Sequence, residues 1–186
     1  MVRLRKYMAA GYADSALWSR VAVDLASLTA DRTLQVHARN WPDTVRVEGT
    51  PSNLLFYLDP DYGFVINAQV LQPYERTGAH DHGESWNLYA VLDGGERIEH
   101  FRPRRRSRAA DVAIPLELIA VHDSKPGYVD LVPPGHIHRK ANGDRRTINL
   151  VVRSQHARAF RRYHYDPDTG SSLEYPGPVQ IPYALT

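Results

Sequence analysis

The chain has 186 residues, of which 42% are hydrophobic and 24% charged, as is ordinary for a soluble globular protein. That length is enough for one domain with a substantial core. The formal net charge of +2 does not indicate a nucleic-acid partner, and no run approaches the length of a membrane span. The lack of cysteine excludes disulfides, thiolate ligands and a cysteine nucleophile. With an amino terminus that shows no apolar signal region, we expect a cytoplasmic protein without a membrane partner.

The first predicted element is a helix over residues 14–30. Its expected buried face is an apolar stripe at helical spacing, formed by Leu17, Trp18, Val21, Leu25 and Leu28. Asp14 or Ser15 can cap the amino end of this helix. A second, weaker helical segment is expected at residues 32–39. We therefore expect an amino-terminal helical segment, residues 1–50, that packs on a sheet.

From Leu54 onward the spacing becomes typical of strands. Short apolar runs separated by turn residues predict strands at residues 54–58, 64–71, 86–92, 97–101, 116–122, 128–131 and 147–152. Many short strands after a helical start predict an all-β barrel or jelly roll with helical decoration, over residues 51–175. The tail at residues 176–186 is expected to be an extended strap or a subunit contact, which leaves a homodimer open.

Five arginines crowd one short loop between two of these strands: Arg102, Arg104, Arg105, Arg106 and Arg108. A basic loop can bind phosphate or nucleic acid. It is also typical of a solvated hairpin tip, and the nearly neutral net charge favours that interpretation.

Two histidines, His80 and His82, stand one residue apart just before a predicted strand. If this stretch is extended, both side chains point to the same side, because residues i and i+2 share a face of a strand. Imidazole is the commonest protein ligand for late first-row metals, so the pair is a candidate metal site. The alternative is a pair of solvated surface histidines.

A second histidine segment follows a glycine-bounded strand and a Pro-Pro-Gly turn, and it resembles the second cupin motif. Every fixed position of that motif is matched, by Gly127, Pro133, Gly135, His138 and Asn142. The earlier stretch resembles the first cupin motif in His80, His82 and Gly94. Two motifs in this order and at this separation imply a cupin double-stranded β-helix, which is a jelly-roll barrel.

The cupin resemblance implies that His80, His82 and His138 bind one metal ion. The family's usual glutamate ligand is absent, because Trp86 or Asn87 stands at its place. Three neutral imidazoles leave the ion its full charge and an open face, which suits O2 chemistry on Fe(II). Zn, Ni or Mn could bind the same three histidines, because the preferences of these metals overlap.

Among the cupins, the chain is most similar to the thiol dioxygenases, and to cysteine dioxygenase in particular. The likeness covers roughly residues 50–175 and includes His80-Asp81-His82, His138-Arg139 with Asn142, and a carboxy-terminal hairpin that begins at Tyr163. It implies a mononuclear Fe(II) centre, O2 as co-substrate and a small-molecule substrate.

Several positions depart from the pattern of that family. Asn87 stands at the place of its crosslinking cysteine, so no cysteine–tyrosine crosslink can form. Val151 and Arg153 replace its catalytic histidine and tyrosine, and Leu55 replaces the arginine that clamps the substrate carboxylate. We therefore expect a retained metal centre in a different substrate pocket, with cysteine as a poor substrate.

The strand at residues 147–152 carries a further pocket candidate at its end. Alternation places Asn149, Val151 and Arg153 on one face, which we expect to be the barrel interior. A buried guanidinium must meet an anion, so Arg153 is a candidate clamp for an anionic substrate group. The alternative is that Arg153 ends the strand and pairs with a surface carboxylate. Asn87 and Tyr89 could line the same pocket, or could be a polar strand residue and a core tyrosine.

Two further residues flank the expected ligands. Glu84 follows His82 too closely to take the usual glutamate place, so it should face solvent or support a ligand. His136 is expected at the pocket mouth, because the motif spacing selects His138. The remaining histidines outside the helices carry no spacing signal and are expected to be structural: His100, His122, His156 and His164.

Three functions remain open from the sequence. The first is a mononuclear non-haem Fe(II) dioxygenase that acts on a small thiol or on a substrate that chelates through oxygens. The second is a three-histidine cupin that uses another divalent metal for hydrolysis or isomerisation. The third is a cupin that binds a small ligand without chemistry.

Overall fold

The computed structural model describes residues 1–11, 15–47, 50–104 and 113–185. Asp14, one of the two expected helix caps, and Arg105, Arg106 and Arg108 of the arginine loop lie outside these residues. Within the described part of that loop, Arg102 is exposed and donates to Glu117 across the hairpin at 3.0 Å.

Three helices precede the sheets: α1 (Val2–Gly11), α2 (Ser15–Thr29) and α3 (Arg32–Arg39). The two helices expected from the sequence are confirmed, whereas α1 was not predicted. The apolar stripe of α2 is buried except at Leu28, which is 45% exposed and was wrongly expected in the core. The next residue, Thr29, is buried instead. No described helix is both long enough and apolar enough to cross a bilayer.

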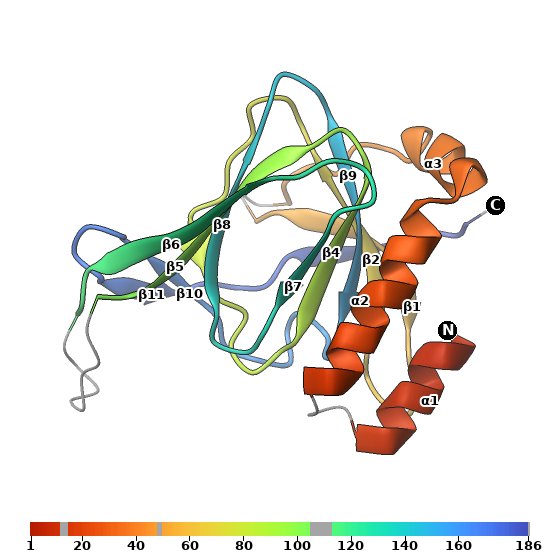
Figure 1. Ribbon diagram of the computed structural model, residues 1–186, viewed down its shortest axis with the longest axis horizontal. Coiled ribbons are helices and arrows are strands. Elements are labelled where there is room, and N and C mark those ends of the chain that lie inside the picture. The colour runs from red at the N-terminus through yellow and green to blue at the C-terminus, as the bar shows by residue number, and fades with distance from the viewer. Residues whose placement is uncertain (12–14, 48–49, 105–112, 186) are drawn as a thin grey trace.

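Twelve strands follow in the described residues: β1 (Ser52–Leu58), β2 (Val65–Leu71), β3 (Ala79–His80), β4 (Asn87–Asp93), β5 (Glu96–Pro103), β6 (Leu116–Asp123), β7 (Val129–Val132), β8 (Ile137–Asn142), β9 (Thr147–Arg153), β10 (Tyr163–Tyr165), β11 (Ser172–Glu174) and β12 (Val179–Pro182). They form two six-stranded sheets that face each other (Figure 1). The first has the order β12-β1-β2-β9-β4-β7 and the second the order β11-β10-β3-β8-β5-β6. The predicted all-β jelly roll with amino-terminal helices is confirmed.

The segment expected to be a carboxy-terminal strap is part of the barrel. Its strand β12 pairs in parallel with β1, so that Ser52 lies opposite Val179. Every other strand pair in the two sheets is antiparallel. The backbone of this tail therefore makes hydrogen bonds with β1 of the same chain.

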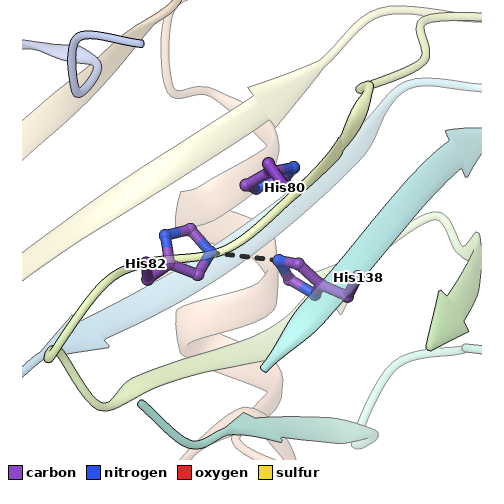
Figure 2. A group of neighbouring side chains, drawn as sticks. All are labelled: His80, His82 and His138. Carbon is purple, nitrogen blue, oxygen red and sulfur yellow. Dashed lines mark hydrogen bonds between the residues drawn. The ribbon is translucent and has the colours of Figure 1, made fainter. Parts of the chain in front are cut away.

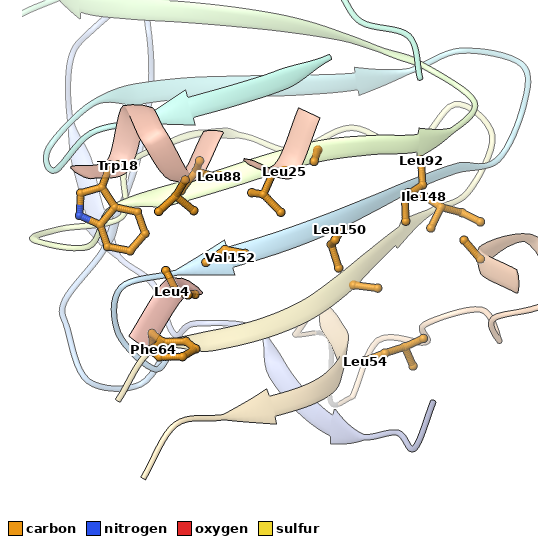
Figure 3. Close-up of a cluster of buried hydrophobic side chains, with 14 of the residues drawn as sticks. Leu4, Trp18, Leu25, Leu54, Phe64, Leu88, Leu92, Ile148, Leu150 and Val152 are labelled. Atoms are coloured by element: carbon orange, nitrogen blue, oxygen red, sulfur yellow. The ribbon is translucent and has the colours of Figure 1, made fainter. Parts of the chain in front are cut away.

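The main hydrophobic core lies between the helices and the outer face of the first sheet (Figures 1 and 3). Trp18 of α2 is fully buried and stacks on Trp86, with 6.2 Å between the ring centroids. Alternation directs Leu88, Leu150 and Val152 of β4 and β9 into this core. The neighbouring residues of β4 and β9 consequently face the space between the two sheets.

The space between the sheets is lined largely by polar side chains. A small apolar cluster of Tyr89, Val132 and Val151 lies there. Beside it, the buried Lys140 ammonium contacts the Glu96 carboxylate at 2.7 Å and lies 3.7 Å from the centre of the Tyr89 ring. Buried polar groups cost free energy unless they are paired, so this interior indicates a functional site.

Candidate metal centre

Four histidines form a row across the second sheet. His80 lies opposite both His164 and His138, and His138 lies opposite His100 on its other side. Residues directly opposite each other in neighbouring strands point to the same face of the sheet. The row therefore runs through β10, β3, β8 and β5, and His82 lies two residues beyond the end of β3.

The structure brings together the three histidines expected to bind a metal. One ring nitrogen from each of His80, His82 and His138 lies within 4.8 Å of the others, and all three residues are buried (Figure 2). The Nε2 atoms of His82 and His138 are 3.0 Å apart. Among the described residues, this is the one group of three or more candidate ligands with such a geometry.

The outer nitrogens of two of these rings are held by hydrogen bonds. Nδ1 of His80 lies 2.9 Å from the carbonyl oxygen of Gly78, and Nδ1 of His138 lies 3.3 Å from a carboxylate oxygen of Asp130. Both partners are acceptors, so each Nδ1 carries the proton and donates it. Each Nε2 is then left with a free lone pair, the arrangement typical of histidines that bind metal.

The buried histidines are neutral at neutral pH. Burial lowers the pKa of His138 to about 4, although the hydrogen bond to Asp130 opposes that shift. Burial also lowers the pKa of His80 and His82 well below their ordinary value, and charge on the neighbouring groups acts in the same direction. Neutral imidazole is the form that donates an electron pair to a metal ion.

The residues present fit a divalent transition-metal ion. Nitrogen ligands lie ~2.1 Å from such ions. The 3.0 Å between the Nε2 atoms of His82 and His138 would allow both to bind one ion at that distance, whereas a pair as far apart as 4.8 Å would have to move closer. A divalent ion held by these three neutral imidazoles would keep its full charge and could take further ligands.

Asp130, which no sequence motif marks, also belongs to the candidate metal centre through its contact with His138. It is buried, and its two carboxylate oxygens lie 3.3 Å from Nδ1 of His138 and 3.4 Å from Nε2 of His100. Burial alone would raise the pKa of Asp130, but the hydrogen bond from His138 and nearby cationic groups hold it below its ordinary value. The signal available in the sequence was an acidic residue within an apolar strand, Val129-Asp130-Leu131-Val132.

The structure agrees with the solvent-facing alternative for Glu84 and corrects the expected place of His136. Glu84 is exposed, and no hydrogen bond within the described residues joins it to a histidine. His136 is half-buried, and its Nε2 lies 2.9 Å from Nδ1 of His100, so it does not lie at the pocket mouth. His136 therefore reaches His138 only indirectly, through His100 and Asp130.

A cavity of about 160 Å³ opens beside His80 and His82. Of the five predicted pocket residues, Tyr89 and Arg153 line it. The other three do not: Asn87, Val151 and Leu55. Asn87 is buried and donates to the carbonyl oxygen of Ser85, Val151 packs on Tyr89, and Leu55 is half-buried along β1.

The lining of the cavity includes residues without any motif signal. Asn53 on β1, Arg162 and Tyr175 all contribute, as does His164 from the histidine row. His164 was expected to be structural, but its ring stacks on that of His80 at 5.6 Å. The Tyr89 hydroxyl lies 3.1 Å from Nε2 of His82, which places a phenol at the edge of the histidine cluster.

The position of Arg153 distinguishes between its two interpretations. Arg153 is 2% exposed, and within the described residues it makes no ion pair with a carboxylate. Its guanidinium lies 5.7 Å from the Tyr89 ring centre. When the Asn53 amide is oriented to accept, its oxygen lies 3.1 Å from Nη2 of Arg153. Arg153 therefore faces the barrel interior and is not a surface strand end.

No family model and no curated protein matches the chain. Among solved structures, an oxalate oxidase in complex with glycolate is 17% identical with a TM-score of 0.39, over 50% of this chain and 42% of its own. A hydroquinone 1,2-dioxygenase solved with Cd²⁺ and 4-hydroxybenzonitrile is 14% identical with a TM-score of 0.46, over 78% of this chain and 72% of its own. The chain thus spans about two-fifths of the oxalate oxidase.

A third solved structure, an uncharacterized conserved protein from Klebsiella pneumoniae, is described as having a double-stranded β-helix domain. It is 14% identical with a TM-score of 0.40, over 70% of this chain and 89% of its own. At these identities the likeness concerns the fold alone. The two facing six-stranded sheets themselves agree with the jelly-roll barrel expected from the motifs.

Proposed function

We propose that the protein is a mononuclear metal-dependent dioxygenase that acts on a small substrate. One observation carries this proposal: three buried, neutral histidines direct ring nitrogens to one point beside a small cavity. A buried set of this kind without an acidic ligand leaves a bound ion strongly electrophilic and accessible from the cavity. When bound, an Fe(II) ion there would supply the site for O2 and for a chelating substrate atom.

We assign the resident metal as Fe(II), with Zn, Ni or Mn as alternatives. The choice of iron rests on the resemblance of the motifs to those of the thiol dioxygenases. The substrate proposed on the same ground is a small thiol or a compound that chelates through oxygens. Cysteine itself is a poor candidate, because Val151, Arg153 and Leu55 replace the residues with which that family recognises and converts it.

The chain's own residues would position the substrate and exclude water. Arg153 presents a buried guanidinium to the cavity, where an anionic group can accept its hydrogen bonds. The Tyr89 hydroxyl, 3.1 Å from Nε2 of His82, can donate to an oxygen that approaches the ion. Asp130 keeps the proton of His138 on Nδ1 and so keeps Nε2 available.

Metal analysis and oxygen consumption together test this function. We expect one divalent ion per chain in freshly purified protein, and O2 uptake by the iron-loaded protein with some members of a thiol and diketone panel. Efficient conversion of cysteine to its sulfinate would contradict the proposed pocket. Turnover by hydrolysis with zinc and no O2 uptake would favour the second function, and ligand binding without turnover would favour the third.

The Arg153→Lys variant tests the clamp separately from the metal. Lysine retains the charge but loses the planar fork that holds a carboxylate by two hydrogen bonds. We expect a raised KM with normal metal content. Unchanged kinetics in both Arg153→Lys and Arg153→Ala would contradict a substrate role for this residue.

A further inference from the structure

Two arginines are buried in the cavity without a protein anion. Arg153 and Arg162 are 2% and 6% exposed, and neither makes an ion pair with a carboxylate within the described part of the chain. Nε and Nη1 of Arg153 and Nε of Arg162 are buried without a hydrogen-bond partner. Both residues line the cavity that His80 and His82 also line.

The two guanidiniums come from opposite walls of the barrel. Arg153 ends β9 in the first sheet, whereas Arg162 immediately precedes β10 in the second. Arg162 lies over the ring of Tyr175, at 5.0 Å from its centre, and Arg153 lies near Tyr89. Burial lowers the pKa of Arg162 to about 10, and the charge of Arg153 lowers it in the same direction. Arginine guanidiniums are charged at neutral pH.

Nearby carboxylates are engaged elsewhere. Asp81 accepts hydrogen bonds from the Tyr165 hydroxyl at 2.7 Å and from the backbone N–H groups of Gly83 and Tyr163. Glu75, which lines the cavity, accepts from the backbone of Gln72 at 3.0 Å. Asp81 acts on Arg162 only through its nearby charge, and within the described residues neither arginine makes a direct ion pair with a carboxylate. A buried, unpaired charge is strongly destabilising, and two of like sign are worse.

We infer that Arg153 and Arg162 together bind one carboxylate of a small dicarboxylate substrate, whose other end faces the three histidines. Guanidiniums present their N–H groups in a planar fork that matches the two oxygens of a carboxylate. The divalent centre takes the second anionic group, and this half of the inference rests on the proposed function. Both positive regions border the same cavity, so one molecule reaches both.

The volume of the cavity limits the size of this substrate. A cavity of about 150 Å³ holds one benzene molecule, and this cavity has a volume of about 160 Å³. A dicarboxylate of about three to five carbons, with roughly seven to nine non-hydrogen atoms, matches this volume and its open mouth. Longer chains and aromatic acids would have to extend out of the cavity.

Titration calorimetry on metal-free and zinc-loaded protein tests the inference without any turnover. The probes are malonate and succinate, with propionate and butyrate as singly charged analogues of similar length and inorganic phosphate as a competing oxyanion. We expect all four acids to bind metal-free protein weakly through the arginine pair. Zinc should raise the binding affinity of the two dicarboxylates at least tenfold and that of the two monocarboxylates less than threefold.

Variants separate the arginine pair from the metal centre. Arg162→Met should weaken propionate binding to metal-free protein at least tenfold, and Arg162→Lys less so. The matched control is Arg161→Met, which removes the same charge from a side chain that is 78% exposed. Because these measurements need no metal, they remain decisive even if the centre binds none.

Thermal unfolding gives a readout that a structural arginine would not give. Removing an unpaired buried charge should stabilise the anion-free protein, so Arg162→Met should raise its Tm by roughly 3–8 °C. A lowered Tm would show that Arg162 has a structural partner and would overturn the inference. Equal affinity of Arg162→Met and parent for propionate would overturn it too, as would a preference for phosphate over both dicarboxylates.

Discussion

Replacing Asp130 tests how the barrel orients its metal ligands. Asp130 is 3% exposed; it accepts a hydrogen bond from Nδ1 of His138 at 3.3 Å, and its other carboxylate oxygen lies 3.4 Å from Nε2 of His100. In Asp130→Asn, the amide oxygen can still accept from His138 while the amide nitrogen faces His100. That arrangement keeps the orientation of the His138 ring but removes the negative charge behind it. In Asp130→Ala, the N–H group of His138 loses its acceptor and His100 loses its neighbouring carboxylate.

The distances set the expected magnitude. Loss of a hydrogen-bonded partner behind a metal-binding histidine costs about 10–100-fold in metal affinity. Both contacts to Asp130 are longer than the ~2.7–2.9 Å of strong charge-assisted hydrogen bonds. We therefore expect Asp130→Asn to lose metal affinity near the lower limit, about tenfold or ~1.4 kcal/mol. Asp130→Ala should lose ~2.7 kcal/mol of metal-binding free energy.

Competition with a chelator of known affinity would measure these losses for Zn²⁺ and Fe²⁺, with circular dichroism as a check on the fold. The matched control is Asp123→Asn, which removes one carboxylate whose side chain is 83% exposed on β6. This control should stay within about twofold of the parent. If folded Asp130→Ala kept its metal affinity within threefold, the orienting role assigned to Asp130 would be refuted.

Three further predictions concern the histidines and the core. His138→Ala should lose most of its bound metal while His136→Ala keeps it, as read by metal analysis; the opposite result would reverse the ligand assignment. His80, His82 and His138 are neutral when folded but gain protons when unfolded below pH 6.5, so acid destabilises the metal-free protein. Its free energy of unfolding should fall by up to roughly 4 kcal/mol per pH unit between pH 6 and 4, measured by urea titration; a flat profile would contradict this. Trp18→Ala should lower the free energy of unfolding by ~3–5 kcal/mol in the same assay. A loss below about 1 kcal/mol would show that the stack of Trp18 on Trp86 is not part of the core.

Local patterns in the sequence were sufficient for the longer elements, such as α2 and β9, whereas α1 and the short strand β3 were not predicted. The helical stripe of α2 and the alternation along β9 follow from periods of a few residues, which the chain displays directly. The spacing of the two motifs likewise selected His80, His82 and His138, and the structure brings these three together. The same reasoning explains why Leu28 was wrongly expected to be buried. The spacing of an apolar stripe along a helix does not show where the surface that covers it ends.

The tertiary structure alone decided which other residues belong to the site. Asp130 and His100 meet His138 only because β7, β8 and β5 come together in one barrel end, and no local pattern encodes that register. Arg161 and Arg162 are adjacent and chemically identical, and nothing in their short segment shows which one faces inward. Pairing of β10 with β3 sets that choice, because a shift of one residue exchanges the two faces of a strand.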